Sequence, residues 1–441
     1  MNIDHLIRRL KQFLSRMLPR RLRLMGLSIA IALSIIFYSI IALTQQPIHL
    51  TMMMSAIDAA QARSTVKEFE AQNPNITIDL VEGPNASNLI EDLYTSSFLL
   101  GDSPYDLIAM DVVWLPKFAA ADWLIDLTDR IPETELADFF SADLQGGRYE
   151  GRLYRLPYRT DAGLLYYRRD LLEQAGLQPP ETFDDLVTAS QQIQQSGAAR
   201  WGYVWQGRQY EGLSAMFVEI LAGSGGFWVN PDTLEVGLDR PEAFKAVEFL
   251  RETIAKGISP SGVTTYQEDE ARRLFQSGNV VFMRNWPYAV PLGNADESAI
   301  KSKFDIKPMV HAPGESSANC LGGWGLGISK TSPHPEAALK VVQFFASAEG
   351  QKLLALENGY LPTRRSLYTD PDIVAQYGYY PSLLEIVEKG VLRPPVAQYA
   401  QASDILQRYL SAALTNRTST ERAMQSAAKE TRRLLDRNSA A

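Results

Sequence analysis

The chain has 441 residues, of which 46% are hydrophobic and 21% are charged, and its formal net charge is −8 at pH 7. Residues 1–23 contain seven basic residues and one acidic residue, so the remaining chain carries 36 basic and 50 acidic residues, a net charge of −14. This acidic balance argues against nucleic acid or an anionic membrane surface as a partner, because both require clustered lysine and arginine.

The first predicted element is an N-terminal segment, residues 1–46, in which a basic start precedes an uncharged apolar run over 24–43. Positive charge before an apolar stretch stays in the cytoplasm while the following chain is translocated, so we expect a periplasmic or other extracytoplasmic location. About 20 apolar residues can span a bilayer. No A-x-A site and no cysteine for lipid attachment follow the run. An uncleaved anchor, a signal peptide cleaved between Ala42 and Gln46 and a buried core helix all stay open.

Strands and helices alternate after Gln46, which predicts an α/β fold. Strands are expected at 49–54, 76–81 and 106–110, and helices at 59–72 and 88–100. The residues of 76–81 alternate strictly, as in a half-buried strand. The short apolar run at 106–110 is typical of a buried parallel strand.

A second α/β unit begins near Asp161. Strands are expected at 162–168, 202–205 and 280–283, and helices after Thr182, at 211–222 and from Pro241. Thr182 and Asp185 have the spacing of a capping box. From Pro335 onward the chain is expected to be mostly helical, ending in an amphipathic polar tail over 416–441. Two such units with no Pro/Ser-rich linker suggest two lobes joined by several crossings.

Several catalytic classes lack their motifs. The four histidines are isolated, so no metal site is expected. The chain has no P-loop, no G-x-S-x-G elbow and no dinucleotide-binding glycine pattern, so no cofactor is expected. Cys320 is the only cysteine, which excludes an intrachain disulfide. We expect it to be a small buried residue and not a reactive thiol.

Aromatic residues beside lone polar residues recur near the predicted strand ends, where α/β sheets bind ligands. The groups are Asp111 with Trp114, Tyr158 with Asp161, Trp205 with Tyr210 and Glu211, Arg284 with Trp286, and Gly323 with Trp324. Carboxylates and arginine bind sugar hydroxyls, and indole faces cover the apolar side of a pyranose ring. Each residue also has a structural explanation, as a helix cap, a core aromatic or a tight turn. These groups alone therefore leave sugar binding as one of several options.

Five stretches together resemble the extracellular solute-binding proteins of bacterial sugar ABC importers, most of all the trehalose/maltose-binding branch. They are 109–114, 161–168, 201–213, 284–289 and 321–329. The string W-G-x-V-W-Q-G-x-Q-Y-E-G-L in 201–213 is the most specific, and the resemblance covers nearly all of 47–435.

The resemblance implies a two-lobed periplasmic-binding-protein fold of type II, with the ligand in a cleft between the lobes. Lobe I would comprise 47–160 and 326–368, and lobe II would comprise 161–325 and 369–441. The implied function is a non-catalytic receptor that delivers a disaccharide or glucoside, of the trehalose, maltose, sucrose or glucosylglycerol class, to an ABC permease. A monomer is expected, and residues 24–43 would tether it to the inner membrane if they are not cleaved.

The resemblance also implies a set of substrate-binding residues. They are Asp58, Asp111, Asp161, Tyr210, Glu211, Trp286, Gly323, Trp324 and Arg364. The carboxylates would accept hydrogen bonds from sugar hydroxyls, the two tryptophans would stack on pyranose rings, the Gly323 backbone would contact the ligand, and Arg364 would donate.

The chain departs from the family pattern in three places. Arg159 stands where related proteins tend to carry an aromatic residue, 85–88 is short and lacks a binding arginine, and 53–56 lacks the usual glycines. These changes leave the sugar open. Two other functions stay open as well: a sugar sensor that signals to a receptor kinase, and an extracytoplasmic glycoside hydrolase using Asp111 and Asp161 as its carboxylate pair.

Overall fold

The computed structural model describes residues 47–436, which form two mixed β-sheets with helices packed against them. The predicted N-terminal segment 1–46, with its apolar run, lies outside the described residues. Within 47–436, no helix combines the length and the apolar character needed to cross a membrane. The α/β class expected from the alternation of strands and helices is confirmed.

The first sheet has five strands in the order β2-β1-β3-β11-β6. They are β1 (Ile48–Ser55), β2 (Ile76–Gly83), β3 (Leu107–Asp111), β6 (Leu156–Ala162) and β11 (Leu321–Ile328). β1 and β3 are parallel, whereas β11 runs antiparallel to both β3 and β6. All five residues of β3 are buried, as expected for a central strand covered on both faces.

The second sheet has four strands in the order β10-β7-β9-β8. They are β7 (Leu164–Arg168), β8 (Trp201–Val204), β9 (Val280–Asn285) and β10 (Phe304–Lys307). Gly163 separates β6 of the first sheet from β7 of the second, so the strand predicted at 162–168 is interrupted there. A Cβ atom at this position would lie 1.7 Å from Glu219 Oε1, which explains why a glycine is needed. A separate hairpin joins β4 (Arg148–Tyr149) to β5 (Arg152–Leu153).

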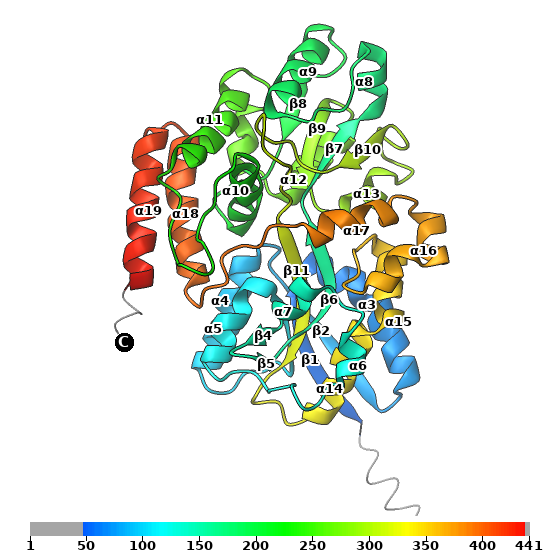
Figure 1. Cartoon of the computed structure of the whole chain (residues 1–441). Helices are drawn as coiled ribbons and strands as arrows, with labels where there is room; N and C mark the ends of the chain where they lie inside the picture. The colour runs from blue at the N-terminus through cyan, green and yellow to red at the C-terminus, as the bar shows by residue number, and fades with distance from the viewer. Residues whose placement is uncertain (1–46, 437–441) are drawn as a thin grey trace, which may run out of the picture. The chain divides into compact units, whose positions relative to one another are not determined.

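Helices from two distant parts of the chain accompany the first sheet (Figure 1). They are α3 (Ala56–Gln72), α4 (Ser87–Leu99), α5 (Leu115–Ala120), α6 (Glu133–Leu136), α7 (Ser141–Gln145), α14 (Pro335–Ala346) and α15 (Ala348–Asn358), with the 3₁₀ turns η1 (Val112–Trp114) and η3 (Arg365–Thr369). α14 packs on β6 and β11, and α15 packs on α3.

The helices between 169 and 293 accompany the second sheet. They are α8 (Arg169–Ala175), α9 (Phe183–Gln195), α10 (Glu211–Gly223), α11 (Pro241–Ala255), α12 (Glu268–Gln276) and α13 (Ala289–Gly293), with the 3₁₀ turn η2 (Ser261–Thr265). α9 packs on β8 and α12 on β9. The predicted capping box is confirmed, because Thr182 Oγ1 accepts from the amide of Asp185 and the Asp185 carboxylate accepts from the amide of Thr182.

The C-terminal helices are α16 (Pro371–Gln376), α17 (Tyr380–Glu388), α18 (Tyr399–Leu414) and α19 (Thr420–Asp436). α18 and α19, orange and red in Figure 1, pack against each other and against α11. Apolar residues on α19 recur at helical spacing and are buried at Ala423, Met424, Ala427 and Ala428. Within the described residues, the amphipathic tail predicted over 416–441 therefore contains a packed helix, α19.

All six predicted strands occur, but β4, β5, β6, β10 and β11 are not predicted from the sequence. β11 contains four glycines, which are normally depleted in strands. Its conformation is imposed by β3 and β6, which pair with it on both sides. The predicted lobe boundaries after residues 160 and 325 fall inside β6 and β11, and the division into lobes stays a prediction.

Candidate functional site

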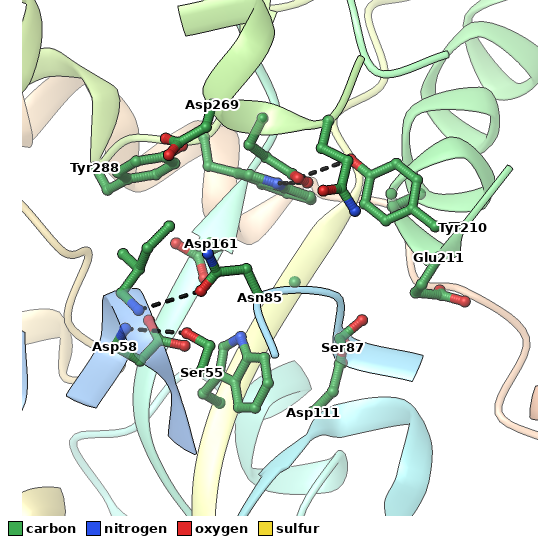
Figure 2. A pocket seen from close by; sticks show the side chains of 18 of the residues that line it. Ser55, Asp58, Asn85, Ser87, Asp111, Asp161, Tyr210, Glu211, Asp269 and Tyr288 are labelled. Atoms are coloured by element: carbon green, nitrogen blue, oxygen red, sulfur yellow. Dashed lines mark hydrogen bonds between the residues drawn. The ribbon is translucent and has the colours of Figure 1, made fainter. Parts of the chain in front are cut away.

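A pocket of about 360 Å³ lies where the ends of several strands converge (Figure 2). Ser55 at the end of β1, Asp111 at the end of β3 and Asp161 in β6 line one side. Tyr210 before α10 and Trp286 after β9 line another. Carboxyl ends of strands are where α/β sheets bind ligands, and the volume lies in the usual range for small-molecule sites.

Eight of the nine predicted binding residues line this pocket. They are Asp58, Asp111, Asp161, Tyr210, Glu211, Trp286, Gly323 and Trp324. Figure 2 places Asp58 and Asp111 along its lower part, Asp161 near the middle and Tyr210 along its upper part. These side chains come from positions up to 266 residues apart, so only the fold brings them together.

The ninth residue, Arg364, does not line the pocket. Its Nε donates to the carbonyl of Ala346 at 2.8 Å, and its guanidinium lies 4.2 Å from the ring centroid of Phe139. The expectation that Arg364 faces the ligand is therefore corrected. Arg364 directly precedes η3, and the backbone bridge between Phe139 and Arg364 holds this arginine beside α14.

Arg159 joins Asp58 and Asp161 in a group that we call the Arg159 cluster, which also contains Tyr360. Arg159 Nη1 donates to Asp58 Oδ1 at 2.8 Å, and its Nε lies 3.5 Å from Asp161 Oδ2. The Tyr360 hydroxyl donates to the same Asp58 oxygen at 2.8 Å. All four side chains are buried, so the ion pairs are weakly screened by solvent.

Arg393 joins Asp111 and Glu211 in a second group, the Arg393 cluster, completed by Tyr399 and Ser403. Both Nη atoms of Arg393 donate to Asp111, at 2.6 and 3.1 Å, and Nη1 also donates to Glu211 at 2.8 Å. Tyr399 and Ser403 donate to the two Glu211 oxygens. The guanidinium therefore holds two buried carboxylates in a forked geometry.

Burial shifts the titration of carboxylates in both clusters. It raises the pKa of Asp161 to about 6, even though the charge of Arg159 acts in the opposite direction. Burial also raises the pKa of Glu211, against the lowering effect of Arg393 and of its two hydroxyl donors. Desolvation disfavours the charged form of a carboxyl group, and nearby cations restore it. Both arginines thus favour ionised carboxylates, which accept hydrogen bonds from a ligand.

Two indoles give the pocket an aromatic surface. Trp286 Nε1 donates to Glu268 at 3.3 Å, and the Tyr210 hydroxyl donates to the other Glu268 oxygen at 2.7 Å. The Trp324 ring meets Trp114 edge to face, with centroids 5.4 Å apart. These partners set the orientation of both indoles before a ligand arrives.

The fully buried ion pair of Arg284 and Glu219 packs against the Trp286 ring. Arg284 donates to Glu219 at 2.9 Å through Nε, and its guanidinium lies 3.8 Å from the Trp286 ring centroid. The amide of Cys320 donates to the same carboxylate. The predicted packing role of Cys320 fits its full burial, which raises the pKa of its thiol to about 12.

The charged residues that line the pocket are mostly acidic. The acids are Asp58, Asp111, Asp161, Glu211, Glu268, Asp269 and Glu270, and the bases are Arg159, Arg273 and Arg393. Seven carboxyl groups against three guanidinium groups leave a negative balance when all are ionised. No group of three or more His, Cys, Asp or Glu residues in 47–436 is arranged to hold a metal ion.

The pocket also contains residues that the sequence analysis did not assign to it. Arg393 and Tyr360 carried no motif, and Glu268 was not singled out. Arg159 was noted only as a departure from the family pattern, and the structure places it in the pocket. The two altered loops reach the site as well, since Ser55, Asn85 and Ser87 line it.

The profile of the family described as bacterial extracellular solute-binding protein matches residues 55–352. The chain belongs to this family. A relative of this solute-binding protein in Deinococcus radiodurans, named "Probable ABC transporter-binding protein", is 34% identical over 356 residues, which cover 79% of this chain and 84% of the relative. The maltotriose-binding protein of Pyrococcus abyssi is 25% identical over 315 residues, covering 70% of this chain and 65% of that protein.

Solved structures agree with this membership. Maltose-bound MalE3 of T. maritima is 39% identical and superposes with a TM-score of 0.84, covering 88% of this chain and 100% of that chain. A solute-binding protein of Thermotoga lettingae bound to α-D-tagatose is 26% identical, with a TM-score of 0.80 and the same coverage. These matches confirm the predicted periplasmic-binding-protein fold. The family also confirms a binding protein and not an enzyme, and agrees with a location outside the cytoplasm.

Proposed function

We propose that this solute-binding protein is the receptor of an ABC importer for a neutral sugar, a disaccharide or glucoside. The observation that carries the proposal is the pocket itself, in which two preoriented indoles lie beside two arginine–carboxylate clusters. An indole face covers the C–H side of a pyranose ring, while ionised carboxylates accept from its hydroxyls. The sugars and the transporter named for the similar proteins support the same class.

The charge of the pocket supports a neutral ligand. Seven carboxyl groups and three arginines line it, and both arginines of the two clusters are already shared between two carboxylates. A phosphorylated or carboxylated sugar would bring a further negative charge into this partly buried space, and like charges there repel strongly. We therefore expect anionic sugars to be excluded.

We assign roles to the pocket residues on the same basis. Asp58, Asp111 and Asp161 would accept from hydroxyls, Trp286 and Trp324 would stack on rings, and the Gly323 backbone would contact the ligand. Tyr210 and Glu211 would also contact the sugar. Tyr210 already donates to Glu268, and the Glu211 carboxylate would accept from a sugar hydroxyl through lone pairs that Arg393 leaves free. Arg393 takes the donor role that the sequence analysis had given to Arg364.

The proposed capture mechanism is closure of two lobes around the sugar, with lobe I at 47–160 and 326–368 and lobe II at 161–325 and 369–441. Residues from both sheets line the pocket, which suits a site that closes by hinge motion. The closed form would then dock on the permease. A tether formed by residues 24–43 would keep receptor and permease at a high effective concentration. Intact mass of the protein recovered from membranes tests the tether, because a cleaved chain would begin near residue 43–47.

Calorimetric titration of the purified full-length protein with trehalose, sucrose, maltose, glucosylglycerol and glucose tests the sugar assignment. We expect tight binding of one of them, weakened at least about tenfold in Trp286→Ala because a ring-stacking surface is lost. Trp201→Ala is the matched control, since Trp201 lies outside the pocket. Heat from none of these sugars, or an equal loss in both variants, would count against the proposal.

A further inference from the structure

Arg159 is enclosed by charged and aromatic side chains. Its guanidinium lies between Asp58 and Asp161, 4.1 Å from the ring centroid of Tyr360 and 5.4 Å from that of Trp324. Arg273 by contrast is exposed and pairs with residues of its own helix. A planar cation held by carboxylates at its edge and by rings at its faces has little freedom to move.

The residues around Arg159 form part of the pocket wall. Asp58, Arg159 and Tyr360 line the pocket and are buried. Behind them, the Tyr360 hydroxyl also contacts Gln61 Oε1, and the backbone N–H of Asp58 donates to Ser55 Oγ at 3.0 Å. The volume that a smaller residue at 159 would release therefore adjoins the pocket and lies against packed protein.

Each carboxylate of the Arg159 cluster is paired with the guanidinium without a ligand. One guanidinium serves two carboxylates, and a tyrosine hydroxyl donates to one of them, so neither acid needs a charged group from the ligand. Asp161 lines the pocket together with its neighbour Gly322 and with Trp286. Fixed acceptors with free lone pairs favour neutral hydroxyl donors over any anion.

Resting on the sugar-receptor function proposed above, we propose that Arg159 is the specificity-determining residue of the site. It positions the carboxylates of Asp58 and Asp161 for one sugar unit, and its side chain closes the pocket to a further unit at that end. The receptor therefore selects short neutral glycosides and discriminates against their longer homologues. A side chain that fills this space excludes a longer ligand by steric clash and costs little affinity for the accepted one.

The test is a length series, in which the full-length protein is titrated with maltose, maltotriose and maltotetraose, with trehalose as a second disaccharide. We expect a disaccharide to bind at least about tenfold more tightly than the trisaccharide. In Arg159→Ala this preference should fall to within about twofold, because the released volume admits the extra unit. Arg159→Lys should keep the preference, since it retains both the bulk and the charge.

Two further variants keep the test interpretable. Arg159→Ala leaves two buried carboxylates without their cation, so the double variant Asp58→Asn with Arg159→Ala removes one of those charges and should fold where the single variant does not. Arg169→Gln is the matched control, because Arg169 pairs with Asp305 on the exposed surface and should leave the length preference unchanged.

The outcomes separate this inference from the function on which it rests. A wild-type protein that binds no sugar overturns the proposed function, and the role of Arg159 with it. A wild-type protein that binds a trisaccharide as tightly as a disaccharide overturns the role of Arg159 alone. The same holds if folded Arg159→Ala or the double variant keeps the wild-type preference.

Discussion

The Arg159 and Arg393 clusters have the same chemistry but connect different parts of the molecule. Each has one buried arginine, two carboxylates and a tyrosine hydroxyl. In the first, Asp58 starts α3 and Asp161 lies in β6, both beside the first sheet. In the second, Asp111 ends β3 of the first sheet, whereas Glu211 starts α10, which follows β8 of the second sheet.

This difference suggests that one set of residue types serves two purposes. The Arg159 cluster shapes the ligand site without joining the two sheets, so changes in it should alter selectivity. The Arg393 cluster joins elements that accompany different sheets. Changes in it should therefore lower the free energy of unfolding more than they alter selectivity. Three experiments test this distinction between the two clusters.

The largest effect is expected from Arg393→Gln. The change leaves Asp111 and Glu211 buried without a cation, and breaking a buried ion pair from one side costs about 3–5 kcal/mol of unfolding free energy. Urea unfolding monitored by tryptophan fluorescence measures it. Arg169→Gln, at an exposed pair, should change the same quantity by less than about 0.5 kcal/mol. A loss below about 1 kcal/mol in Arg393→Gln would refute a joining role.

A smaller and pH-dependent effect is expected from Asp161→Asn. The pKa of Asp161 is raised from 3.8 to about 6, so the folded protein binds the proton more tightly than the unfolded chain. This contribution to stability is full below pH 3.8 and is lost as the pH rises through about 6. The asparagine variant lacks that loss, so relative to wild type it should gain up to about 3 kcal/mol between pH 4 and pH 7.5.

Urea unfolding of both proteins across this pH range measures the gain from Asp161→Asn. Asp305→Asn, at an exposed ion pair, is the control and should run parallel to the wild type. A pH-independent difference between Asp161→Asn and wild type would mean that Asp161 is not the titrating group.

The smallest effects are expected from Tyr360→Phe and Tyr399→Phe, each of which removes one hydroxyl from a cluster. Each lost hydrogen bond to a carboxylate is worth about 1–2 kcal/mol. We expect Tyr360→Phe to weaken sugar binding by calorimetry with little change in unfolding, and Tyr399→Phe to lower unfolding free energy with less effect on affinity. Equal patterns in the two variants would show that the clusters do not differ in purpose.

Local patterns in the sequence were sufficient for much of the fold. Strict alternation predicted β2, an apolar run predicted β3, and capping residues predicted the start of α9. They were not sufficient for β11, because its glycines disfavour an isolated strand and only pairing with β3 and β6 holds it extended. The break between β6 and β7 at Gly163 was not predicted either, because it depends on the close approach of Glu219, which is 56 residues away in the chain.

The site divides in the same way. Eight of the nine residues that the family resemblance implied line the pocket, and most of them lie in or next to strands of the two sheets, where α/β folds bind ligands. Arg364 was misplaced and Arg393 was missed for one reason. An arginine in a loop has a long side chain, and which carboxylate it reaches depends on elements packed around it and not on its neighbours in the chain.

The alternation of strands and helices, the family and the positions that could contribute carboxylates and indoles all follow from periodicity and short motifs, which are local properties of the chain. Which arginine pairs with which acid depends on tertiary packing. A buried charge must be matched by another buried charge. The partners of Arg159 and Arg393 lie up to 282 positions away, and only the packed sheets bring them within hydrogen-bonding distance.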